Sequence, residues 1–191
     1  MRGIALPLFA VLLAAGPAAA QEQSFTIDPR HTFPAYEIEH LGVSPQPGRF
    51  NETQGRVILD PALRRGSVEV TIKARSIDTG VAALDRLLRS EDFFDVERFP
   101  EVGYRSTRAR FDGERLVGVE GDLTIRGVTR PVALDVQGFR CTVQLLAQGK
   151  RCGATLTTTI KRSEFGMTKF AGSVISDEVR IRIAVEAVLD Q

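Results

Sequence analysis

The 191-residue sequence contains no tryptophan and only two cysteines, two histidines, two tyrosines and two methionines. So few imidazole and thiol groups argue against a zinc centre, because such a centre takes three or four ligands of these kinds. The sequence also lacks an excess of either charge, with 25 basic and 24 acidic residues. A formally neutral protein has no electrostatic reason to bind nucleic acid or anionic lipid surfaces, so we expect no nucleic-acid partner.

Long apolar runs are absent except at the N-terminus. Arg2 precedes an apolar stretch from Ile4 to Ala15, and Ala18 to Ala20 supply the small residues of a cleavage site. This pattern predicts a secretory signal peptide over residues 1–20, cleaved after Ala20. No later run approaches membrane-spanning length, so we do not expect an integral membrane protein. Residues 21–191 are then long enough for a single domain with its own core.

The two cysteines, Cys141 and Cys152, flank the segment TVQLLAQGKR, which we interpret as a hairpin connection. An even number of cysteines in an exported protein favours a disulfide. Closing a loop this short should stabilise the fold by about 2–3 kcal/mol.

Apolar and polar residues alternate through most of the remaining sequence. Segments such as SVEVTIKA and VRIRIAVEAV repeat with a period of two, which is typical of antiparallel strands with one dry and one wet face. The residues that we assign to the dry face are Val68, Val70, Ile72, Ala74, Val117, Val119, Leu123, Ile125, Val132, Leu134, Val136, Leu156, Ile160, Val179, Ile181, Ile183 and Val185.

Turn residues at Asp112-Gly113, Arg126-Gly127 and 61–66 separate these segments, and only residues 81–89 have near-helical spacing of their leucines. About eight strands with one short helix predict an all-β fold, an antiparallel β-barrel, with a two-sheet sandwich as the alternative. A barrel of about eight strands either fills with side chains or holds one small ligand. Medium-sized dry-face residues and the lack of tryptophan leave both possibilities open.

Both histidines lie in RHTFPAYEIEHLG, with Glu37 and Glu39 between them. Two imidazoles and two carboxylates so close together raise the possibility of a metal or catalytic site. Pro34 interrupts the segment because it has no N–H and restricts the residue before it. We therefore expect the strand to begin near Ala35.

In such a strand Tyr36, Ile38 and His40 share one face and the two glutamates the other. If Ile38 faces the lumen, the carboxylates point to water and cannot complete a metal shell with His40. We therefore predict neither a metal site nor a catalytic site here. Tyr36 and His40 are candidates for binding the polar head of a ligand. The alternative is that neighbouring backbone or water satisfies them.

Aromatic residues gather just after the predicted helix, in SEDFFDVERFP. Phe93 and Phe94, with Phe99, either clamp the helix onto the end of the barrel or form a gate over its mouth. Phe165 and Met167 in EFGM are candidates for a second rim element, because methionine adapts to irregular apolar ligands.

Six segments together resemble, in order, the YceI-like family of periplasmic polyisoprenoid-binding proteins: DPRHT, HLGVS…GRFNETQG, SIDTG, DRLLRSEDFFDVERFPEV, GDLTIRGVTRPV and KRSEFGM…ISDEVRI. The resemblance implies a lipocalin-like barrel, located in the periplasm, whose apolar lumen holds a long isoprenoid or similar lipid. It also implies a homodimer, and it brings no catalytic residues and no cofactor. The sequence departs from the family pattern at Thr32, Pro34 and Tyr36 and in its cysteine pair.

Three classes of function follow. The leading hypothesis is an exported binding protein that sequesters or carries a polyprenol or a quinone tail. A structural or partner-binding barrel with a filled core is the alternative, and an enzyme acting on lipids is less favoured because no nucleophile, metal cluster or triad can be recognised. The lumen wall would consist of Ile38, Val68, Val70, Ile72, Val119, Leu123, Ile125, Val132, Leu134, Val136, Val179, Ile181, Ile183 and Val185.

Overall fold

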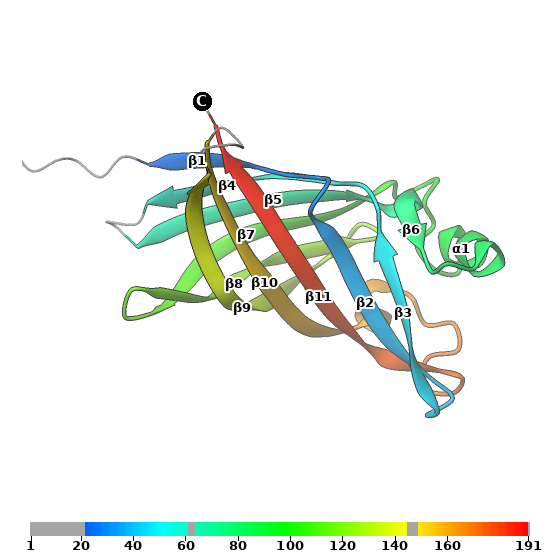
Figure 1. The fold of residues 1–191 in the computed structure, drawn as a ribbon. Helices are drawn as coiled ribbons and strands as arrows, with labels where there is room; N and C mark the ends of the chain where they lie inside the picture. The colour runs from blue at the N-terminus through cyan, green and yellow to red at the C-terminus, as the bar shows by residue number, and fades with distance from the viewer. Residues whose placement is uncertain (1–21, 61–63, 145–148, 191) are drawn as a thin grey trace, which may run out of the picture.

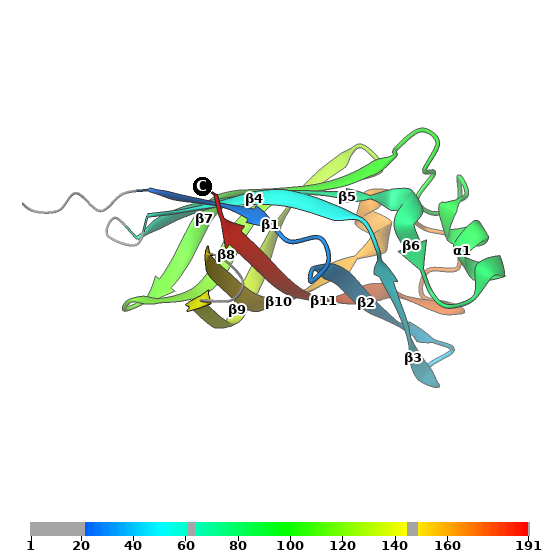
Figure 2. The same cartoon turned by 45° about the horizontal axis from the view of Figure 1, so that its top comes forward.

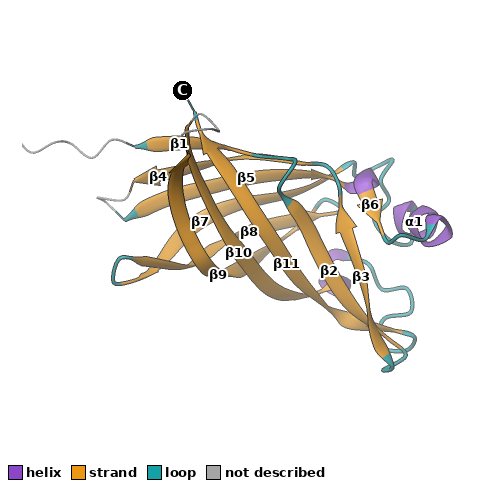
Figure 3. Ribbon diagram, in the orientation of Figure 1, coloured by secondary structure: helices purple, strands orange, loops and turns teal. Residues whose placement is uncertain are grey.

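The structure, a computed structural model, describes residues 22–60, 64–144 and 149–190, so the predicted signal peptide and its cleavage site lie outside the described residues. Strands make up most of the described chain (Figures 1 and 3). They are β1 (Gln23–Ile27), β2 (Phe33–His40), β3 (Ser44–Phe50), β4 (Thr53–Asp60), β5 (Arg65–Lys73), β6 (Ile77–Asp78), β7 (Glu101–Asp112), β8 (Arg115–Ile125), β9 (Val128–Gln144), β10 (Gly149–Lys161) and β11 (Ile175–Leu189). The helical elements are η1 (Ala74–Ser76), α1 (Ala82–Arg89) and η2 (Arg162–Phe165).

Eight strands close into a ring in the order β1-β4-β5-β7-β8-β9-β10-β11, and β11 pairs back onto β1. Every pairing in the ring is antiparallel. The prediction of an all-β, eight-stranded antiparallel barrel with one helix is therefore confirmed, and the two-sheet sandwich is wrong.

Strand β11 uses one edge for two partners in succession. Its residues 187–189 pair with β1, and residues between 175 and 184 pair with β2. β2 continues into β3, which pairs briefly with β6, so this hairpin branches off the ring. Figure 2 shows the β2–β3 hairpin and α1 projecting from the same end of the barrel.

The start of β2 differs from the prediction. The strand begins at Phe33 rather than near Ala35, and Pro34 lies within it opposite Ile183. The ladder between β2 and β3 ends at the Ala35–Arg49 pair. The missing N–H of Pro34 therefore interrupts no pairing on that side, which is where proline is tolerated in a strand.

The break between β1 and β2 is held by a buried carboxylate. The side chain of Asp28 is 3% exposed, and its Oδ2 lies 3.0 Å from both Nη1 of Arg151 and Nδ1 of His31. The backbone N–H of Arg30 donates to Oδ1 at 3.0 Å. Burial alone would raise the pKa of Asp28, but the hydrogen bonds from Arg151, His31 and Arg30 outweigh it and hold that pKa well below its usual range.

The predicted disulfide between Cys141 and Cys152 is confirmed. The two residues lie directly opposite each other in the β9–β10 ladder, so the bond joins adjacent strands of one hairpin. It closes a loop with a sequence separation of 11.

Replacing both cysteines by alanine should lower the free energy of unfolding by about 2–3 kcal/mol, because the bond restricts the unfolded chain. The variant should still fold, since the ladder on both sides of the pair remains. Urea unfolding of the oxidised protein, the reduced protein and the double variant measures the effect. Free thiols at both positions in protein prepared under oxidising conditions, detected by alkylation and mass, would contradict the pairing.

Side chains are almost completely buried at β1, where Phe25 and Ile27 lie, and also at the end of the barrel that carries α1 and η2. The buried residues at that end are Ala74, Ile77, Val96 and Phe165. The inward side chains of β11, by contrast, are only half-buried. The barrel is therefore packed in these two places, while its middle is not.

Candidate functional site

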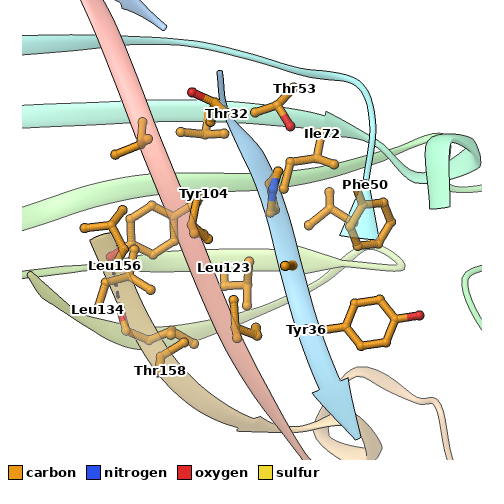
Figure 4. Close-up of a pocket in the computed structure, with 18 of the residues that line it drawn as sticks. Thr32, Tyr36, Phe50, Thr53, Ile72, Tyr104, Leu123, Leu134, Leu156 and Thr158 are labelled. Carbon is orange, nitrogen blue, oxygen red and sulfur yellow. Dashed lines mark hydrogen bonds between the residues drawn. The ribbon is translucent and has the colours of Figure 1, made fainter. Parts of the chain in front are cut away.

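The middle of the barrel is a cavity of about 530 Å³. All eight strands of the ring contribute side chains to its wall, and the wall is mostly aliphatic and aromatic (Figure 4). The volume falls within the range of pockets that hold small ligands. The interior is therefore hollow rather than filled.

All fourteen residues predicted to form the lumen wall line this cavity: Ile38, Val68, Val70, Ile72, Val119, Leu123, Ile125, Val132, Leu134, Val136, Val179, Ile181, Ile183 and Val185. On β11, Ile181 and Ile183 face inward, whereas Arg180 and Arg182 are exposed on the outer face. The inward side chains remain half-buried because they face open space. Their role in binding a ligand stays a prediction.

One dry-face assignment was wrong. The β7–β8 ladder shifts register between Arg110 and Phe111, and Gly118 and Leu116 are the partners on either side of this shift. Val117 is the extra residue between them, and Leu116 takes the place on the cavity wall that we predicted for Val117. A bulge of this kind re-aims the side chains that follow it.

Three strands of the wall were missed, since no residue of β7 was among the predicted dry-face residues although Val102 and Phe111 line the cavity. Phe25 and Ile27 of β1 and Val57 and Leu59 of β4 all line the cavity. The alternation in SFTI is only four residues long, and Ile58 between the two β4 residues turns an alternating pattern into a continuous apolar run. The signals of β1 and β4 are present but weak.

The rim candidates divide into two groups. Tyr36, His40, Phe93, Phe94 and Met167 line the cavity. Phe165 is not among the lining residues and is 1% exposed, so its assignment to the rim was wrong. It belongs to the packed core because it ends η2, which lies against the end of the barrel.

The aromatic segment after α1 is anchored by a ring contact. Phe94 meets Phe50 of β3 edge-to-face, with 5.4 Å between ring centroids. Edge-to-face pairs are a stable arrangement of aromatic rings. Phe93, the preceding residue, is buried and also lines the cavity. This contact favours the clamp over the freely moving gate.

Tyr36 supplies a hydroxyl at the α1 side of the cavity. Its ring covers Gly48 of β3, where a Cβ would lie 2.3 Å from Cζ of Tyr36, so Gly48 makes room for the ring in this position. Burial raises the pKa of Tyr36, and the nearby negative charge of Asp85 in α1 raises it further. The group stays a neutral donor, and Figure 4 shows its hydroxyl pointing away from Tyr104 and Leu123.

A second tyrosine on the wall, Tyr104, was not predicted. Its hydroxyl lies 3.1 Å from the carbonyl oxygen of Val132 and 3.2 Å from that of Val119, to either of which it donates. Gly121 makes room for the ring, since a Cβ there would lie 2.7 Å from Cζ of Tyr104. Burial, with a smaller effect of Asp122 and Glu120, raises the pKa of Tyr104 to about 12. Its polar group is satisfied by the barrel itself.

Exposed residues among those that line the cavity show where it reaches solvent. At the α1 side these exposed lining residues are Gln46 and Pro47 of β3 and Leu84 of α1. The cavity therefore opens between β3 and α1, beside Tyr36. At the other end of the barrel Phe139, which follows the positive-φ residue Gly138 in β9, is also exposed.

Within residues 22–60, 64–144 and 149–190, histidine, cysteine and acidic side chains nowhere gather in a group of three that could hold a metal ion. His31 belongs to the Asp28 cluster, whereas His40 lies on the cavity wall. In the same described ranges, no helix combines the length and apolarity needed to cross a membrane.

A closed, eight-stranded antiparallel ring with a hollow apolar interior defines a lipocalin-like barrel that has room for an apolar ligand. The sequence model of the YceI-like domain family matches residues 25–187 of this chain. The chain therefore belongs to the YceI-like family.

Relatives match along nearly the whole chain. A UPF0312 protein of Pectobacterium carotovorum is 36% identical over 194 residues, which cover 97% of this chain and 95% of the relative. Protein YceI of Salmonella arizonae is 34% identical over 190 residues, covering 95% and 94%.

Among solved structures, BcnA of Burkholderia cenocepacia superposes with a TM-score of 0.72 at 25% identity, covering 85% of this chain and 99% of BcnA. A polyisoprenoid binding domain from Saccharophagus degradans superposes with a TM-score of 0.64 over 87% of this chain and 98% of that domain. The latter is 16% identical, so that likeness concerns the fold.

Proposed function

We propose that this protein is a binding protein, not an enzyme, which sequesters or carries a long-chain isoprenoid lipid such as a polyprenol or a quinone tail. The observation that carries the proposal is the cavity of about 530 Å³ with its apolar wall. Each buried methylene contributes about 0.8 kcal/mol, so a dozen supply about 10 kcal/mol before the costs of association. The polyisoprenoid binding domain from Saccharophagus degradans, with the same fold, supports the choice of ligand class.

The proposal extends to the setting in which the protein works. We propose that residues 1–20 direct export to the periplasm, which the disulfide supports because such bonds persist in oxidising compartments. We also propose a homodimer. The tip of the β2–β3 hairpin supports it, since Leu41 and Val43 are exposed apolar residues. Among the described strands, residues 44–48 of β3 pair on one side only, with β2.

Extraction of the protein purified from its exported fraction tests the central claim. Organic solvent should release an isoprenoid lipid in a near-stoichiometric amount, identified by mass spectrometry, because an apolar cavity of this size retains its ligand through purification. Protein unfolded and washed before extraction is the control. An empty extract together with no binding of added polyprenol would contradict the proposal. The intact mass of the same material shows whether cleavage follows Ala20, and light scattering shows whether it is a dimer.

A further inference from the structure

The inward row of β10 ends in a charged residue. Ala154, Leu156, Thr158 and Ile160 alternate into the cavity, and the same period of two brings Arg162, the first residue of η2, onto the wall. Arg162 is only 4% exposed. The strand thus places a guanidinium group among apolar neighbours at the η2 end of the cavity.

Part of this guanidinium group is satisfied by backbone. Nε donates to the carbonyl oxygen of Ser176 and Nη1 to that of Met167, both at 3.0 Å. Nη2 is buried and has no partner among the described residues. The carboxylate of Asp177 accepts instead from Ser163, at 2.9 Å from its backbone nitrogen and 2.7 Å from its hydroxyl.

A buried cation is stable only when an acceptor compensates it. Burial lowers the pKa of Arg162 and the charge of Asp177 opposes this, but an arginine stays protonated near neutral pH. Across the described ranges, no carboxylate forms an ion pair with Arg162. The N–H groups of Nη2 therefore have no acceptor among the described residues. Because Arg162 lines the cavity, a ligand bound there can supply one.

We propose that Arg162 binds an anionic oxygen head group, a carboxylate or a phosphate, of a long-chain amphiphile whose tail lies along the apolar wall. Guanidinium pairs with both groups through charge-assisted hydrogen bonds, which are stronger than bonds to a neutral oxygen. The inference rests on the proposed function and adds a direction to it: the head lies at the η2 end, and the tail runs toward the β7–β8 turn. Thr53 on β4 also has an unpartnered hydroxyl on the wall, but a neutral group does not call for an anion.

Matched ligands with one tail and different heads test the role of Arg162. Palmitate, hexadecyl phosphate and cetyl alcohol are each titrated against protein loaded with the neutral dye Nile red. The unmodified protein should bind at least one anionic ligand about ten- to a hundredfold tighter than the alcohol, as expected for a bond to a charged group. Arg162→Met should bring that ratio near one and leave the affinity for the alcohol within about twofold. The ratio for palmitate against that for hexadecyl phosphate distinguishes the two head groups.

Arg182→Met is the control, because it removes the same charge from the outer face of β11. It should keep the original ratio. Arg162→Lys, with melting followed alongside, covers the case in which Arg162→Met does not fold: it keeps the charge and must keep a preference for an anion.

The assignment would be overturned if Arg162→Met kept the preference for the anionic ligand over the alcohol. It would also be overturned if Arg182→Met abolished that preference. A lysine variant that binds the alcohol normally without any preference would overturn it as well. In these cases the alcohol still binds, and only the role of Arg162 fails. If the unmodified protein binds added polyprenol but none of the three ligands, the assignment of Arg162 fails, and if it binds none of the four, it is the proposed function that fails.

Discussion

Ile183→Phe should shorten the longest tail that the barrel accepts. Ile183 is an inward residue of β11, opposite Leu156 on one side and Pro34 on the other, and it is half-buried beside the cavity. A phenyl ring there takes space from the ligand rather than from packed neighbours. Losing contact with about four methylenes removes about 3 kcal/mol, which weakens a long isoprenoid by at least about a hundredfold. Short isoprenoids should bind almost as before.

The measurement is a series of prenols of increasing length, titrated against both proteins, with thermal unfolding followed in parallel. Ala184→Phe is the matched control, since it adds a ring at the next residue, which is exposed on the outer face. It should leave the length preference unchanged. Overpacking a filled core destabilises a protein instead of changing its ligands. A large fall in melting temperature with no change in length preference would therefore show that no tail occupies this space.

Asp28→Asn should lower the free energy of unfolding at neutral pH by about 3–5 kcal/mol, the range for removing one partner of a buried ion pair. Asp28 is almost completely buried, and Arg151, which is 20% exposed, loses its closest carboxylate partner in this variant. The amide cannot neutralise that charge. The cluster also holds the segment between β1 and β2 in place, so residues 28–32 should become more mobile in this variant.

The effect should depend on pH in a defined direction. Because the folded state holds the pKa of Asp28 below its usual value of 3.8, the stabilisation is complete above that value and is lost as the pH falls below it. Urea unfolding measured from pH 7 downward should show that the unfolding free energies of Asp28→Asn and the unmodified protein converge below about pH 4. Glu120→Gln, at an exposed pair with Arg108, is the control and should have little effect. Equal unfolding free energies of Asp28→Asn and the unmodified protein at pH 7 would rule out this role.

Strands with a strict alternation could be predicted from the sequence, and the direction of their side chains followed. In VRIRIAVEAV the inward residues Val179, Ile181, Ile183 and Val185 were identified, and of the inward residues only the small Ala187 was missed. Where a bulge interrupts the period, as at Val117, the same rule assigns the wrong neighbour. The local sequence carries no mark of the register shift, because it is the partner strand that imposes it.

The polar part of the site was harder to predict. Arg162 stands at the end of an alternating segment, TLTTTIKR, but a charged residue at a strand end is ordinarily solvated. Its burial results from η2 and the carbonyl groups of Ser176 and Met167, which the chain brings back from later residues. The hollow interior could not be predicted either, since it depends on how many strands close the ring and how they are staggered.

The closure of the ring by β1 and β11 has a consequence for how the chain folds. Ser24 donates a hydrogen bond to Asp190, 166 residues away, and the pairs between β1 and β11 are almost as distant in sequence. Contacts of such high contact order form slowly, because a long loop must be closed before any of them is gained. Until β11 docks, β10 presents an unpaired edge, which is a template for aggregation. The barrel is therefore most exposed to misassembly in the interval before its last strand joins its first.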